Sequence, residues 1–124
     1  MASRALGRLL FITAILGFST LTACGGGAIP RDQMTMAQAT VKGAEVGGAP
    51  QEPKAALHLK LAKEQIAKAN SLIAKGDNDE AARVIARAQA DADLALALAR
   101  QANARRETQE AREQIEQIKE NIIK

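Results

Sequence analysis

Apolar residues recur at helical spacing through most of the chain from residue 31 onward. In residues 31–46 they lie three or four positions apart and so share one helical face: Met34, Ala37, Val41 and Ala44. Gly47 and Gly48, followed closely by prolines, are typical of a helix end. The pattern therefore predicts a short first helix over 31–46.

A second seam follows over residues 53–75, with the alternating spacings of four and three that mark a heptad pattern: Ala55, Leu59, Ala62, Ile66, Ala69 and Ile73. Pro53 suits the first position of a helix. Gly76 suits the left-handed residue just after a helix, because it has no Cβ to clash. Asp77 and Glu80 have the spacing of a capping box for the next helix. The corner at 76–77 predicts an antiparallel hairpin.

The third helix has no stop signal, because neither Gly nor Pro occurs between Asp77 and Lys124. Its first half should face the second helix through these residues: Ala81, Val84, Ile85, Ala88, Ala92, Leu94, Ala95 and Leu98. Its second half has a seam of its own, again at spacings of four and three: Ala104, Thr108, Ala111, Ile115, Ile118 and Ile122. A helix of this length spans about 70 Å and outruns the second helix. The tail seam must therefore bury against the first helix, a second copy or another protein.

The predicted fold is all-α: a short helix, then an antiparallel helical hairpin with a long C-terminal coiled-coil-like helix, over about 31–46, 53–75 and 77–124. Alanine, the best intrinsic helix former, supplies 11 of the 24 residues from 81 to 104. Both phenylalanines, Phe11 and Phe18, precede residue 24, and the chain has no Trp or Tyr. The core of the helical domain must therefore be aliphatic.

The amino terminus has the layout of a secretory signal peptide, with Arg4 and Arg8 ahead of an apolar stretch over 9–21. That stretch is shorter than the roughly 20 apolar residues of a membrane-spanning helix. The next residues resemble the lipobox of bacterial lipoproteins: Leu21, Thr22, Ala23 and Cys24. The resemblance implies that a diacylglyceryl group is attached to the cysteine thiol and that the bond before the cysteine is cleaved.

Cys24 is the single cysteine, so no disulfide can form within the chain, and three glycines beside it argue against a core position. We expect residues 1–23 to be a signal peptide, 24–30 a lipidated flexible leash, and 31–124 an Ala-rich helical domain. Two or more acyl chains anchor a protein stably. In such lipoproteins an Asp after the cysteine is the usual signal for inner-membrane retention, so Gly25 implies the outer membrane, on its periplasmic side.

Between residues 49 and 95, alanine-rich stretches lie on both sides of a polar turn at Gly76 and Asp77. The residues of this pattern are Ala49, Pro50, Leu61, Ala62, Ala67, Lys68, Ala69, Gly76, Asp77, Glu80, Ala81, Ala82, Ala90, Asp91, Ala92, Asp93, Leu94 and Ala95. This set resembles domain of unknown function 4398, an Ala-rich lipoprotein domain of Gram-negative bacteria that is often followed by an OmpA-like peptidoglycan-binding domain. The resemblance covers roughly half of the chain. It implies an outer-membrane, periplasm-facing protein and supplies no catalytic residues.

Little in the chain suggests catalysis, a metal site or a cofactor, and we expect none of the three. His58 is the single histidine and should lie on a helix surface; Asp91 and Asp93 diverge on a helix and should be solvated. The net charge of +3 falls to +1 once Arg4 and Arg8 are removed, because 15 basic residues then face 14 acidic ones. This balance, without aromatics to stack on bases, gives no reason to expect nucleic-acid binding.

The leading hypothesis is a lipid-anchored, non-enzymatic structural or adaptor protein. Its partners would be the membrane, through Cys24, and a second copy or an envelope protein, through one face of the tail: Ala111, Ile115, Ile118 and Ile122. An alternative follows from a resemblance in outline to the major murein lipoproteins, which join a terminal lysine to peptidoglycan. Lys124 would form that link, although Ile122 and Ile123 stand where those proteins carry polar or basic residues. A further alternative, a tetratricopeptide-like peptide binder, generally needs three or more repeats, and the chain has one hairpin.

Overall fold

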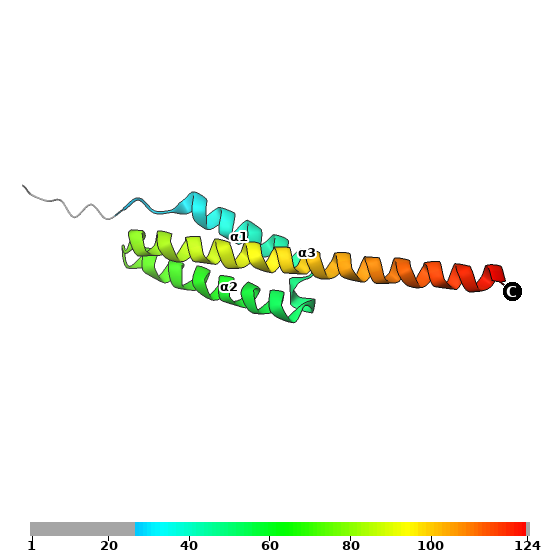
Figure 1. Ribbon diagram of the computed structural model, residues 1–124. Coiled ribbons are helices and arrows are strands. Elements are labelled where there is room, and N and C mark those ends of the chain that lie inside the picture. The colour runs from blue at the N-terminus through cyan, green and yellow to red at the C-terminus, as the bar shows by residue number, and fades with distance from the viewer. Residues whose placement is uncertain (1–26, 124) are drawn as a thin grey trace, which may run out of the picture.

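Residues 27–123, the part of the chain that the computed structural model describes, fold into three α-helices and one short 3-10 helix. The elements are α1 (Arg31–Val46), η1 (Ala49–Gln51), α2 (Pro53–Ala74) and α3 (Asn78–Ile123). Both α1 and α2 lie along the first half of α3, which then runs on beyond them (Figure 1). The all-α architecture, with its hairpin and long C-terminal helix, is confirmed.

Helix α1 runs parallel to α3, because hydrogen bonds hold its two ends at two heights along that helix. Just before α1, the side-chain amide of Asn78 donates to the Gly27 carbonyl at 2.6 Å. Just after α1, the side-chain amide of Asn103 donates to the Gly47 carbonyl at 3.0 Å. Since α2 returns in the opposite direction, the body is an up-down-up arrangement that ends near Asn103.

The core consists mostly of alanines, which allow the three helices to approach closely. One cluster lies toward the middle of α3: Val41, Ala44, Ala49, Ala55, Leu59, Ala62, Ala92, Ala95 and Ala99. A second lies nearer the hairpin corner: Met34, Ala37, Ala69, Val84 and Ile85. The whole predicted face of α1 is buried in these two clusters.

The predicted hairpin seam is largely confirmed, with one error on α3. On α2, Ile66 and Ile73 are only half-buried, whereas the four other seam residues are buried. On α3, Leu98 is half-buried, and Leu94, which we assigned to the core, is 42% exposed. At 100° per residue, Leu94 points away from the side of α3 that α1 and α2 cover.

The corner between α2 and α3 is a Schellman motif centred on Gly76. This glycine has φ +84°, as predicted, and its N–H donates to the Ile73 carbonyl at 3.0 Å. The N–H of Asp77 donates to the Leu72 carbonyl, also at 3.0 Å, which completes the motif. Two carbonyls at the end of α2 are thus satisfied without water.

The predicted capping box is wrong. Glu80 turns instead to Arg83, one turn further on, with 2.6 Å between its Oε2 and the arginine Nη2. Asp77 contributes its backbone carbonyl, which accepts the Ala81 N–H at 2.9 Å. The arginine, a charged partner, has replaced the backbone N–H that Glu80 would have accepted from.

Candidate functional site

The tail of α3 is the most exposed part of the described chain. Every residue from 104 to 123 is exposed, and no other element lies beside this stretch in Figure 1. The side chains of the seam include Ile115, Ile118 and Ile122, which are 52%, 58% and 77% exposed. Of the three partners considered for this seam, the first helix is excluded, because α1 ends at the level of Asn103.

The apolar seam of the tail continues backward onto the body of the protein. Ala90, Leu94, Ala97 and Gln101 precede Ala104 at the same spacings of four and three, and all are exposed. They lie on the side of α3 opposite the buried residues Ala92, Ala95 and Ala99. We call the following set the exposed seam: Ala90, Leu94, Ala97, Gln101, Ala104, Thr108, Ala111, Ile115, Ile118 and Ile122.

Sequence reasoning found the tail half of this surface and missed the body half. The signal was present, because residues 90–101 keep the heptad spacing, but an alanine-rich helix is apolar on several faces at once. Thr108 fits an apolar surface, since its hydroxyl already donates to the Ala104 carbonyl at 2.8 Å. The exposed seam is thus continuous and nearly free of unpaired polar groups.

Charged residues flank the exposed seam unevenly. One flank is basic, with Arg105, Arg112 and Lys119 at intervals of seven residues. The other flank carries Asp93 and Arg100 beside the body, and one acid and two amides in the tail at the same intervals: Glu107, Gln114 and Asn121. In the described structure, Lys119 pairs with Glu116 at 2.8 Å and Arg106 contacts Asn103. Both of these pairs join residues three apart on α3.

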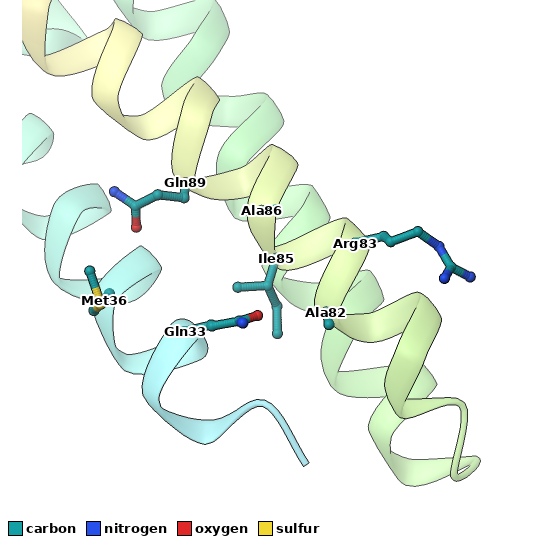
Figure 2. A pocket seen from close by; sticks show the side chains of 7 residues that line it. All are labelled: Gln33, Met36, Ala82, Arg83, Ile85, Ala86 and Gln89. Carbon is teal, nitrogen blue, oxygen red and sulfur yellow. The ribbon is translucent and has the colours of Figure 1, made fainter. Parts of the chain in front are cut away.

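A shallow groove of about 380 Å³ lies between α1 and α3 (Figure 2). Gln33 and Ile85 point toward one another across it, and Arg83 points away. Met36, at 64% exposed, adds apolar surface on the α1 side. The groove is open and mainly apolar, and its lining offers no arrangement of acid, base and nucleophile.

A polar cluster joins α2 to α3 and corrects two predictions. His58 and Asp91 are half-buried, with 2.8 Å between Nδ1 and Oδ1. The second oxygen of Asp91 accepts the side-chain amide of Gln65 at 2.7 Å. His58 is therefore not a free surface residue, and Asp91 is not simply solvated, whereas Asp93 is exposed as predicted. One carboxylate accepts from two side chains two turns apart on α2, which fixes the register of the hairpin.

Across the α1–α2 interface, Glu45 accepts from two lysines. The Nζ atom of Lys63 lies 2.5 Å from one carboxylate oxygen, and that of Lys42 lies 3.3 Å from the other. These two hydrogen bonds hold the pKa of Glu45 below its ordinary value of 4.5, and the one from Lys63 has the larger effect. No three His, Cys, Asp or Glu side chains gather at metal-binding distance within residues 27–123.

The predicted lipidation site and lipobox lie outside the described residues: Leu21, Thr22, Ala23 and Cys24. Lys124, the predicted peptidoglycan link, lies outside them too. The end of the predicted leash is described, and it is held against α3 through the Gly27 carbonyl. Nowhere in residues 27–123 is a helix both long enough and apolar enough to span a bilayer.

Comparison with known proteins gives one match. The family described as Domain of unknown function (DUF4398) matches residues 32–119, which include nearly all of α1, the hairpin and most of the tail. No curated protein and no solved structure matches the chain. The resemblance noted between residues 49 and 95 is confirmed, and the match extends it in both directions. Because the match covers well over half of its length, this chain belongs to the DUF4398 family.

Proposed function

We propose that this protein is a lipid-anchored, non-enzymatic structural or adaptor lipoprotein of the bacterial outer membrane. Cys24 carries the lipid, and the exposed seam of α3 binds a partner in the periplasm. One observation carries the proposal: the 20 residues from 104 to 123 form a helix that leaves the body and presents three half- to mostly exposed isoleucines on one face.

The energetics of an isolated helix support a partner for the tail. A helix of this length is marginal in water unless it packs an apolar face against something. Fully burying one isoleucine contributes roughly 1.5–3 kcal/mol. A contiguous apolar face that stays in water forgoes this stabilisation, and on soluble proteins such faces mark interaction sites.

The arrangement of the body separates anchor from tail. The chain enters the body at Gly27, which lies against the first residue of α3. The tail leaves at the opposite end, near Asn103, and extends about 30 Å further at 1.5 Å per residue. With a lipid on Cys24, the body acts as a spacer that holds the tail away from the membrane surface.

Cell fractionation combined with mass spectrometry of the mature amino terminus tests this proposal. We expect the full chain in the outer-membrane fraction, with a diacylglyceryl-modified Cys24 as its first residue. A matched control, Ile115→Ser with Ile118→Ser, should keep the lipid and the location, because it changes only the tail. Recovery of the unsubstituted chain from the soluble periplasm with an acyl-free terminus would refute the proposal.

A further inference from the structure

We infer that the exposed seam binds a second copy of this chain, with the two α3 helices packed parallel and in register from Ala90 to Ile122. The inference names a partner for the surface used in the proposed function. It draws on contacts and charges of α3 and not on the lipid. The lipid anchor of the proposed function and the pairing of two copies can therefore be refuted separately.

The length and regularity of the exposed seam favour a helical partner that supercoils with α3. The seam keeps its alternating spacing over ten positions, about five heptads, without a charged residue. Coiled coils are recognised from three to four such heptads. A heptad seam drifts about 20° per heptad around a straight helix. Over five heptads it stays in contact only with a partner helix that winds around it.

The flanking charges disfavour an antiparallel overlap of the two tails. In heptad terms Arg105, Arg112 and Lys119 occupy e positions, and Arg100 and Glu107 occupy g positions. When two tails overlap in antiparallel orientation, e positions face e positions, so three basic side chains face three basic side chains. In a parallel pair, e positions face g positions, so Arg112 meets Glu107 of the second copy while Arg105 meets its Arg100. The attractive pair and the like-charge pair offset each other, so the parallel pair lacks the net repulsion of the antiparallel one.

One seam residue favours the in-register arrangement. The a positions of the tail are the β-branched residues Thr108, Ile115 and Ile122, and its d positions are Ala104, Ala111 and Ile118. Gln101 is the one amide at a seam position. In register, its side chain meets the same amide of the second copy and can exchange a hydrogen bond, whereas a shift of one heptad places it against Leu94 or Thr108. A polar residue at an a position fixes register in this way.

The body leaves room for the second copy. Helices α1 and α2 cover the side of α3 that carries Ala92, Ala95 and Ala99, and the exposed seam lies on the opposite side. The seam residues of the body are small at Ala90 and Ala97, so the second α3 can approach closely. A parallel pair also places Gly27 of both copies at the same end, where two lipids could enter one membrane.

Single cysteines at three heights of the exposed seam test the inference in the full chain. Leu94→Cys, Ala111→Cys and Ile118→Cys are each treated in intact cells with a short bis-maleimide, and dimers are scored on denaturing gels. All three should form covalent dimers, because in-register parallel helices bring each position next to its own copy. Glu113→Cys and Glu120→Cys, on the outer face of the same helix, are the matched controls and should remain monomeric. The chain without an added cysteine is the background control for cross-linking.

Two results would overturn the inference. Dimers at only one of the three heights would indicate an antiparallel pair, and dimers at none would exclude a second copy as the occupant. Repeating the three variants with Cys24→Ser separates this inference from the proposed function. We expect the dimers to persist there although the lipid is lost. Loss of dimers in both backgrounds, together with a normal lipid on the chain that keeps Cys24, would refute the second copy and leave the proposed anchored protein standing.

Discussion

Replacing Ile115 and Ile118 together with Ser should separate association from folding. Each isoleucine is about half exposed in the single chain, at 52% and 58%. Roughly half of the 1.5–3 kcal/mol for burying an isoleucine is therefore available to a partner, about 0.8–1.5 kcal/mol per side chain. A pair of chains contains four such side chains, so the substitution removes about 3–6 kcal/mol from association. Since 1.4 kcal/mol is a factor of ten, Kd should rise by about 10² to 10⁴.

The same substitution should leave the hairpin body unchanged. Ile and Ser have similar intrinsic helix propensities, and exposed substitutions usually change stability by less than about 0.5 kcal/mol. Sedimentation equilibrium measures Kd, and circular dichroism measures helix content and Tm. Glu113→Ser with Glu120→Ser, on the outer face of the tail, is the control and should associate like the unsubstituted chain. An unchanged Kd for the isoleucine variant would show that the tail seam does not hold the copies together.

Four further changes probe other parts of the account. Cys24→Ala should leave an unprocessed, unlipidated precursor, detected by its mass; a normally processed, acylated product would contradict the lipobox. Gly76→Val should lower stability by about 1–2 kcal/mol, because φ there is +84°, and Gly76→Asn should lower it less; equal melting temperatures would refute the turn geometry. Asp91→Ala should lower stability by about 1–2 kcal/mol, because it leaves two half-buried donors on α2 unpaired, whereas Asp93→Ala should be nearly neutral. Lys63→Met should lower the free energy of unfolding at neutral pH but not in acid. The pKa of Glu45 is lowered below 4.5, so its ion pair stabilises the fold above that pH and is lost as pH falls through the folded pKa. Chemical denaturation should therefore show the difference in unfolding free energy between the unsubstituted chain and Lys63→Met disappearing on acidification.

The face of α1 and most of the hairpin seam could be predicted from the sequence, because residues three and four apart share a helical face whatever the tertiary context. The turn at Gly76 could be predicted for a similar reason, since a left-handed helix end strongly favours glycine. Leu94 was misplaced because alanines surround it on several faces of α3. Local spacing cannot then decide which of two apolar faces meets the hairpin.

The polar contacts between helices could not be predicted, because they depend on the rotation and register of one helix against another. Asp91 meets His58 only once α2 and α3 are packed, 33 residues apart in the chain. The position of α1 along α3 depends likewise on the amides of Asn78 and Asn103, whose partners are backbone carbonyls. No spacing rule within one helix gives such contacts.

Hydrogen exchange along α3, followed at several concentrations of the full chain, tests most directly whether the exposed seam is an association surface. Amides between 81 and 99 lie in the packed body and should exchange slowly at every concentration. Amides between 104 and 123 should exchange quickly in dilute solution, because an isolated helix opens easily, and should become protected as the concentration rises and two copies pair. Tail amides whose exchange is the same at every concentration, whether fast or slow, would contradict the account.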